Sequence, residues 1–118
     1  MKVLLVDDEK EFVSTLAERL SFRGIEADWV ADCESAIKKV LEQSYDVAVL
    51  DVKMPGISGI ELGERIHELR PDQKIIFCTG HGSAADYDAG IAQTGKRYYL
   101  AKPINIDDLI QKMKEILG

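Results

Sequence analysis

The chain has only two cysteines, Cys33 and Cys78, and their spacing does not form a CxxC pair. We therefore expect two small, reduced, apolar side chains rather than a disulfide or a thiolate metal site. The chain also lacks any apolar stretch close to the ~20 residues that cross a bilayer. Its apolar start stops at Asp7, too early for a signal peptide. Together these features predict a cytoplasmic protein with no membrane partner.

Runs of lysine or arginine are also missing, and the formal net charge is -6. Nucleic-acid binding needs a basic patch to face the phosphates, so we expect no direct nucleic-acid binding. The composition is otherwise that of an ordinary globular protein, with 46% apolar and 31% charged residues. A length of 118 residues predicts one domain, residues 1–118. We see no repeat or linker, and we expect no output domain in this chain.

Five short β-like runs alternate with helical patterns along the chain. They cover residues 2–6, 25–30, 47–50, 74–77 and 98–101. The first, third and fourth runs are continuously apolar, which is typical of strands covered on both faces. The second run alternates more and is expected nearer an edge. Strands joined by single helices pair in parallel through right-handed crossovers, so the pattern predicts a doubly wound α/β fold with a five-stranded parallel sheet.

Helical periodicity fills the intervals between these runs. Apolar residues recur from Phe12 to Leu20, and Gly24 is expected to end that helix. The other helices have expected caps and inner stripes: Asp32 with Ala36, Ile37, Val40 and Leu41; Ser58 with Leu62, Ile66 and Leu69; and Asn105 with Ile106, Leu109, Ile110, Met113, Ile116 and Leu117. A further helix around residues 83–93 has a thin apolar stripe. It is either a mobile element or a surface helix that needs little anchoring.

Polar side chains follow four of the five runs. Asp7 and Asp8 follow the first, Asp51 the third, Thr79 the fourth and Lys102 the fifth. The C-terminal ends of parallel strands share one edge, so we expect these side chains to converge. Carboxylates without His or Cys partners favour Mg²⁺, or Mn²⁺, over zinc. An aspartate can attack phosphorus to form an acyl phosphate, and a lysine can neutralise phosphoryl oxygens, so the pattern favours phosphoryl transfer.

Each of these residues also has a plain structural explanation when it is taken alone. Asp8 could cap a helix or form a turn, and Thr79 is a common loop residue. Lys102 before Pro103 could be a solvated lysine in an extended dipeptide. Their joint occurrence at successive strand ends is what favours the functional interpretation.

These motifs, taken together, resemble the receiver domain of bacterial two-component response regulators. The matching segments are Asp7-Asp8, Asp51-Val52-Lys53-Met54-Pro55, Gly59, Thr79-Gly80 and Lys102-Pro103. The resemblance covers essentially all of residues 2–117. It implies a flavodoxin-like (βα)5 fold with strand order 2-1-3-4-5.

The resemblance also implies a phosphoacceptor and a metal site. Asp51 would take a phosphoryl group from a phosphohistidine on a sensor histidine kinase or a phosphotransfer protein. Asp8 and Asp51 would bind Mg²⁺ directly, and Asp7 would bind it through water. The backbone carbonyl of Lys53 would complete the protein ligands.

A conformational switch is implied as well. Lys102 and Thr79 would contact the phosphoryl group, and Thr79 would move toward it as the ring of Tyr99 turns inward. The face formed by the helix around residues 83–93, the last strand and the last helix would then change shape. That face would regulate an unknown output partner or a fused output domain, or would support a phosphorylation-dependent homodimer.

Three classes of function remain open at this point. In the first, the chain is a signalling switch that catalyses only its own phosphorylation and dephosphorylation. The second is a Mg²⁺-dependent phosphohydrolase with an aspartyl nucleophile, although such enzymes usually carry a second aspartate where this chain has Lys53. The third is a docking module that works without phosphorylation. The intact set of Asp8, Asp51, Thr79 and Lys102 argues against it.

Overall fold

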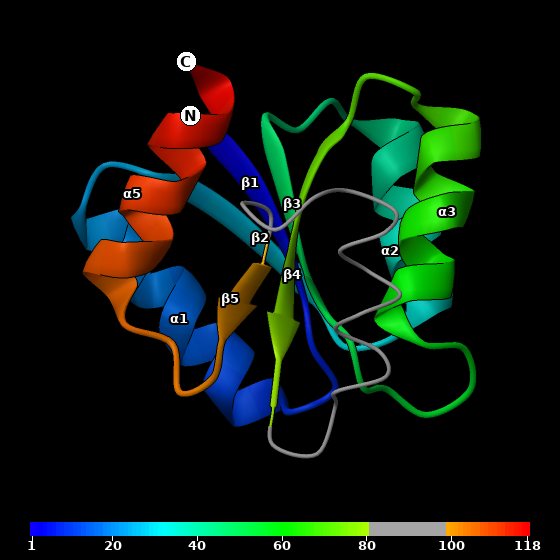
Figure 1. The fold of residues 1–118 in the computed structure, drawn as a ribbon, viewed down its shortest axis with the longest axis horizontal. Helices are drawn as coiled ribbons and strands as arrows, with labels where there is room; N and C mark the ends of the chain where they lie inside the picture. Colours follow the sequence, from blue (N-terminus) through cyan, green and yellow to red (C-terminus); the bar gives the residue numbers. More distant parts are fainter. Residues whose placement is uncertain (81–98) are drawn as a thin grey trace.

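The computed structural model describes residues 1–80 and 99–118. Five parallel strands form one sheet in the order β2-β1-β3-β4-β5, which confirms the predicted fold (Figure 1). The described elements are β1 (Lys2–Val6), α1 (Lys10–Phe22), β2 (Glu26–Val30), α2 (Cys33–Glu42), β3 (Val47–Asp51), α3 (Gly59–Leu69), β4 (Lys74–Thr79), β5 (Tyr99–Ala101) and α5 (Ile106–Leu117). The helix expected around residues 83–93 and the expected strand residue Tyr98 lie outside the described residues.

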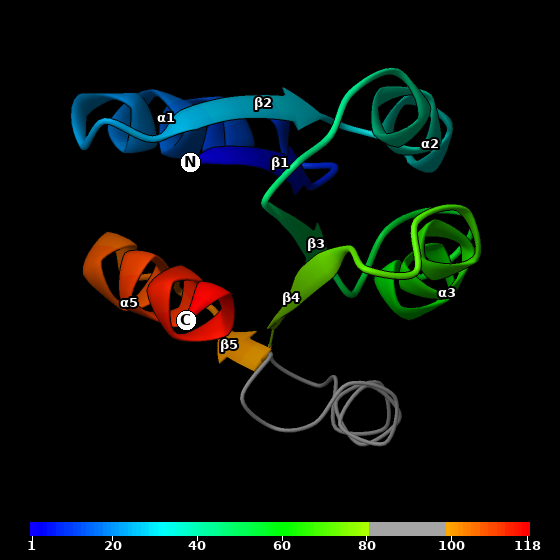
Figure 2. The same cartoon turned by 90° about the horizontal axis from the view of Figure 1, so that it is seen from above.

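Helices cover both faces of the sheet, with α1 and α5 on one side and α2 and α3 on the other (Figure 2). Two apolar clusters fill these layers. The strands contribute to both: Leu4, Val6, Ala48, Leu50, Ile75 and Phe77 face α2 and α3, whereas Val3, Leu5, Val47, Val49, Ile76 and Cys78 face α1 and α5. This two-sided burial explains the continuous apolar runs in the sequence. In the part of the chain that is described, no helix is both long and apolar enough to cross a bilayer.

The helix ends agree with the predicted caps. Side chains accept backbone N–H groups at three helix starts: Asp32 from Ser35, Ser58 from Glu61, and Asn105 from Asp107 and Asp108. Gly24 follows α1 with φ at 76°, a left-handed conformation that glycine adopts without strain. Its N–H donates to the carbonyl of Ser21 at 3.1 Å, which completes the C-terminal cap.

For three residues of the predicted inner stripes, the prediction of burial is wrong. Leu41, Leu69 and Leu117 are 56%, 44% and 41% exposed, respectively. Each lies in the last turn of its helix. Helical periodicity fixes the direction of a side chain, but it does not tell whether an apolar layer still lies beneath the end of the helix.

Candidate metal and phosphoryl site

Strand β3 carries Asp51 to the C-terminal edge of the sheet. The sequence predicted that this strand ends at residue 50, but Asp51 itself pairs in register with Cys78 of β4. The N–H of Val52 donates to the carbonyl of Cys78 at 3.0 Å, and the N–H of Gly59 donates to the carbonyl of Val52 at 2.8 Å. The backbone on both sides of Asp51 is therefore fixed, and the residue is only 6% exposed.

Gly59 permits an unusually close approach between helix α3 and this strand end. A Cβ atom at this position would lie 2.0 Å from the backbone oxygen of Asp51. Such a contact is far inside any van der Waals distance, so a larger residue would force the loop or the helix to move. The glycine thus lets α3 begin directly against the backbone of Asp51.

The acid pair after β1 lies beside Asp51. Asp7 is 4% exposed, and its Oδ1 accepts the N–H of Glu9 at 2.9 Å. Asp8 is exposed. One carboxylate oxygen from each of Asp7, Asp8 and Asp51 lies within 4.8 Å of the other two. Acids that are far apart in the sequence are therefore brought together at one edge of the sheet.

This donor set suits a hard divalent cation. All three groups are carboxylates, which Mg²⁺ prefers over the imidazole and thiolate ligands typical of zinc sites. Asp7 and Asp51 are buried whereas Asp8 is exposed, so a cation here would have protein oxygens on one side and water on the other. Mg²⁺ commonly keeps several water ligands, and this arrangement allows them.

Lys102 reaches the same cluster from the end of β5. Its backbone N–H donates to the carbonyl of Thr79 at 2.7 Å, which ties the end of β5 to the end of β4. Its ammonium nitrogen Nζ lies 2.9 Å from Oδ2 of Asp7, 3.3 Å from Oδ1 of Asp51 and 3.6 Å from Oε1 of Glu9. Thr79 is the last residue of β4 and is also buried. The structure thus brings Lys102, Asp7 and Asp51 into direct contact.

Burial and charge shape the electrostatics of this cluster. Burial raises the pKa of the Asp51 carboxyl group to about 6, and the neighbouring charge of Asp7 acts in the same direction. The ammonium group of Lys102 opposes both effects. Burial alone would lower the pKa of Lys102, but its hydrogen bond to Asp7 and the charge of Asp51 raise this pKa above its ordinary value. Lys102 therefore remains a cation near neutral pH.

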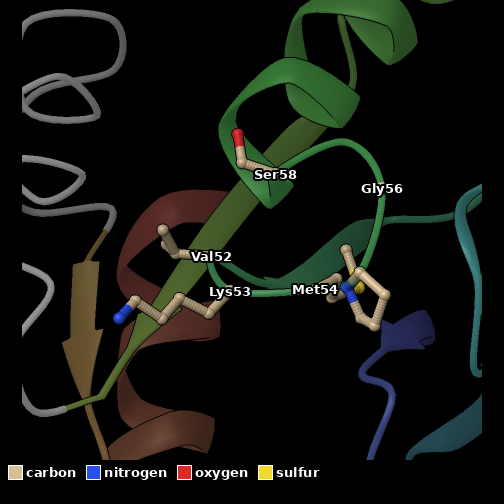
Figure 3. Close-up of a pocket in the computed structure, with 6 residues that line it drawn as sticks. Val52, Lys53, Met54, Gly56 and Ser58 are labelled. Atoms are coloured by element: carbon tan, nitrogen blue, oxygen red, sulfur yellow. The ribbon is translucent and has the colours of Figure 1, made fainter.

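The loop after β3 borders a hollow of about 400 Å³ (Figure 3). Its lining residues are Val52, Lys53, Met54, Pro55, Gly56 and Ser58. The side chain of Lys53 extends away from Met54 and the rest of the loop (Figure 3). Met54 packs against the apolar cluster beneath α2 and α3, whereas Lys53 is exposed. One side of the loop is thus anchored in the apolar cluster, whereas the side chain of Lys53 lies in solvent.

Tyr99 lies in a different environment from the charged cluster. It is 5% exposed and belongs to the apolar cluster on the α2 and α3 side of the sheet. Its ring stacks on Phe77, with the ring centroids 5.3 Å apart. The ring of Tyr99 therefore occupies an inward position in this structure.

Sequence reasoning missed two residues of the site. Glu9 contacts the ammonium group of Lys102, and its signal in the sequence was its place directly after Asp7 and Asp8. Phe12 was assigned to the core stripe of the first helix. The structure instead places the ammonium of Lys102 over the ring of Phe12, 5.1 Å from its centroid. Periodicity alone could not separate Phe12 from its fully buried helix neighbours.

Comparisons with known proteins agree with this geometry. The family model for the response regulator receiver domain matches residues 3–114. The chain is 34% identical over 116 residues to the transcriptional regulatory protein TcrA of Mycobacterium tuberculosis. This alignment covers 98% of this chain and 46% of that protein. It is 36% identical over 120 residues to the two-component response regulator PhoP of Pseudomonas aeruginosa. This second alignment covers 99% of this chain and 52% of that protein. The chain thus spans about half the length of these curated relatives.

Solved structures give a similar result. A CheY-like receiver domain protein from Methanospirillum hungatei superimposes with a TM-score of 0.88 at 33% identity, covering 98% of this chain and 92% of that one. The response regulator TrrA of Thermotoga maritima, solved in complex with Mg²⁺-BeF, has a TM-score of 0.82 at 36% identity and covers 98% of both chains.

Proposed function

This chain belongs to the response regulator receiver domain family, and from that premise we propose that Asp51 is its phosphoacceptor. A receiver domain is a signalling domain rather than a classical enzyme. One observation carries the assignment of the residue. Asp7 and Asp51 are both buried members of the three-acid cluster, and both contact the ammonium group of Lys102. Both oxygens of Asp7 are already engaged, by that ammonium group and by a backbone N–H, whereas the described residues engage only Oδ1 of Asp51. A phosphoryl group on Asp51 would therefore meet a cation site on one side and Lys102 on the other.

The reaction transfers a phosphoryl group from an imidazole nitrogen to a carboxylate oxygen. A carboxylate oxygen of Asp51 attacks the phosphorus atom of a phosphohistidine, a new P–O bond forms, and the P–N bond breaks as the imidazole leaves. Dephosphorylation is a separate step, in which water attacks the phosphorus atom of the acyl phosphate, the P–O bond to Asp51 breaks, and inorganic phosphate leaves while the carboxylate is regenerated. This chain supplies positioning and charge for both steps, so we propose that it catalyses its own phosphorylation and dephosphorylation.

Charge compensation is the main catalytic contribution. Asp8 and Asp51 would hold Mg²⁺ directly, Asp7 would hold it through water, and the backbone carbonyl of Lys53 would complete the protein ligands. Mg²⁺, or Mn²⁺ in its place, would neutralise charge on the phosphoryl oxygens when bound. Lys102 would contact a phosphoryl oxygen as a second positive charge. Its raised pKa supports this role, because the ammonium group keeps its proton near neutral pH.

The output step would begin at Thr79. Its hydroxyl would move to bind the phosphoryl group. This movement would favour the inward position that the ring of Tyr99, the second switch residue, already has in this structure. The close backbone tie between Lys102 and Thr79 supports a coupled movement of the two strand ends. Phosphorylation adds charge and acceptor oxygens at the site, which favours one of two arrangements of the β5 and α5 region.

The partners follow from the family. We propose that a sensor histidine kinase or a phosphotransfer protein supplies the phosphoryl group in the cytoplasm. The relatives of this chain include proteins named as transcriptional regulatory proteins, which supports an output domain or a separate partner as the receiver of the signal. A phosphorylation-dependent homodimer is a further form that this output could take.

Labelling with acetyl phosphate tests the assignment of Asp51. The purified chain is mixed with acetyl phosphate and Mg²⁺, and intact-protein mass spectrometry follows the gain of one phosphoryl group. Reduction with borohydride converts an acyl phosphate of aspartate into homoserine, so peptide mapping then identifies the residue. We expect stoichiometric, slowly reversed labelling at Asp51, and no labelling when a chelator removes the metal.

Matched variants make this test decisive. Asp51→Asn should abolish labelling, whereas Asp72→Asn, at an exposed aspartate, should leave it unchanged. Labelling that persists in Asp51→Asn would refute the assignment. Steady turnover of small phosphate esters would instead favour a phosphohydrolase. A folded wild-type chain that takes no label at all would favour a docking module.

A further inference from the structure

Phe12 lies between the apolar layer and the charged cluster. Its side chain packs against the cluster of apolar residues under α1 and α5, and it is only partly buried. The neighbours one and two turns along the same helix, Leu16 and Leu20, are buried in that cluster. Phe12 differs from them because the Lys102 ammonium group lies over its ring, 5.1 Å from the centroid. A cation over an aromatic face at this distance is attracted by the ring.

Among the described residues, the other contacts of this ammonium group are all carboxylates. Asp7 and Asp51 are the buried partners, and Glu9 is an exposed one, with 69% of its side chain accessible to solvent. Asp7 and Asp51 also belong to the three-acid cluster that suits a divalent cation. A bound cation would compete with Lys102 for the same oxygens. The contact with the uncharged ring would not be lost in this competition.

A lysine side chain without fixed contacts is costly to hold in one place. It has four rotatable bonds, and ordering all of them costs rotamer freedom. The exposed Glu9 carboxylate is a weak anchor, because surface ion pairs are screened by water and salt. The Phe12 ring is held by the helix and by the apolar layer beneath it. It therefore offers a rigid surface for the lysine.

We propose that Phe12 is a positioning residue for Lys102, whose ring keeps the ammonium group at the sheet edge when a divalent cation occupies the carboxylates. The inference rests on the proposed role of Asp51, because Lys102 is positioned there for a phosphoryl group on that residue. Phe12 itself does not touch the phosphoryl group. It acts only through Lys102.

The first test does not depend on phosphorylation. NMR spectra of the folded protein, with and without saturating Mg²⁺, report the methylene protons of Lys102 next to its ammonium group. The Phe12 ring current should shift these protons upfield in both conditions. Phe12→Leu keeps an apolar side chain but removes the ring, so the signals should move toward their random-coil positions. Phe12→Tyr keeps the ring and should preserve the shift.

The second test measures the rate constant for labelling by acetyl phosphate at saturating Mg²⁺. Phe12→Leu should slow labelling about fivefold, the factor that corresponds to roughly 1 kcal/mol of cation–π attraction. Phe12→Tyr should label at close to the wild-type rate. Ile25→Val is the control for lost packing, because Ile25 belongs to the same apolar cluster but is not a contact of the lysine. It should lower the melting temperature without slowing labelling.

The outcomes separate this inference from the proposed function. Unchanged Lys102 signals in Phe12→Leu, or an unchanged rate constant in a protein whose wild type is labelled, overturn the inference. Equal slowing in Ile25→Val also overturns it, because packing alone would then explain the effect. If the wild type takes no label, the proposed function fails, and the NMR comparison alone then decides whether Phe12 holds Lys102.

Discussion

The ammonium group of Lys102 and the carboxylate of Asp51 lie 3.3 Å apart, and both side chains are largely shielded from solvent. The pairing is unequal, because the same ammonium group lies closer to Asp7, at 2.9 Å. One positive charge therefore serves two buried negative charges. The cluster keeps an excess of negative charge, and this excess has consequences for stability and for metal binding that can be measured separately.

The first consequence is that Asp51 destabilises the metal-free fold near neutral pH. Its pKa is raised from 3.8 to about 6 in the folded protein. Between these two values the folded chain binds more protons than the unfolded chain, so the free energy of unfolding falls as pH rises. Above this window the cost amounts to about 1–3 kcal/mol. Asp51→Asn removes the ionisable group, so this variant should be more stable than the wild type by about that amount near neutral pH.

Urea unfolding in the presence of a chelator measures this effect across the acid-to-neutral range. The wild-type and Asp51→Asn curves should converge at acid pH and separate as pH rises. Asp72→Asn, at an exposed aspartate, should follow the wild-type curve. Parallel curves for the wild type and Asp51→Asn would show that burial does not raise the pKa of Asp51.

The second consequence concerns competition for the carboxylates. Lys102 and a divalent cation are attracted to the same oxygens of Asp7 and Asp51. Lys102→Met keeps the length of the side chain but removes its charge. This variant should bind Mg²⁺ about fivefold to tenfold more tightly, because the cation no longer displaces an ammonium group. Although it binds metal better, it should label more slowly with acetyl phosphate.

Isothermal titration of the metal-free protein with MgCl₂ measures the affinity. Lys38→Met is a suitable control, because Lys38 is an exposed residue of helix α2 and should leave the affinity unchanged. Weaker Mg²⁺ binding by Lys102→Met would contradict the competition and would instead mean that the lysine organises the acids for the metal.

Much of the fold could be predicted from the sequence, because each local signal has a direct physical cause. Asp32 and Ser58 cap helix starts with side-chain oxygens, and Gly24 caps a helix end with its own N–H. All of these hydrogen bonds depend only on near neighbours. The convergence of Asp7 and Asp51 follows from the parallel sheet, since the ends of its strands share an edge. These features depend on residue type and spacing, which the sequence contains.

Other features depend on contacts between distant elements, and the sequence did not reveal them. Leu41 and Leu69 continue the apolar periodicity, but no apolar layer covers them at the helix ends. Phe12 matches its helix stripe, yet its partner is Lys102 from the other end of the chain. The raised pKa of Asp51 depends on its burial and on the distance to Asp7. Each of these features depends on distances between elements, which only the three-dimensional structure gives.

The last prediction concerns Gly59, where the backbone and the site meet most closely. In Gly59→Ala the new Cβ would lie 2.0 Å from the backbone oxygen of Asp51, so the start of helix α3 must move away from the strand end. We expect a loss of about 3 kcal/mol or more in the free energy of unfolding, in the range of severe packing changes. The displaced Asp51 should also label much more slowly, measured at a temperature where the variant is fully folded.

Gly24→Ala separates this steric effect from the loss of a glycine as such. Gly24 has a positive φ of 76°, but a Cβ there would meet nothing within 4 Å. Its replacement should cost roughly 1–2 kcal/mol for the left-handed backbone and should leave labelling unchanged. If Gly59→Ala costs no more than Gly24→Ala and labels at the wild-type rate, the strand end can yield without disturbing Asp51. The close approach of α3 would then not be what fixes the position of the carboxylate.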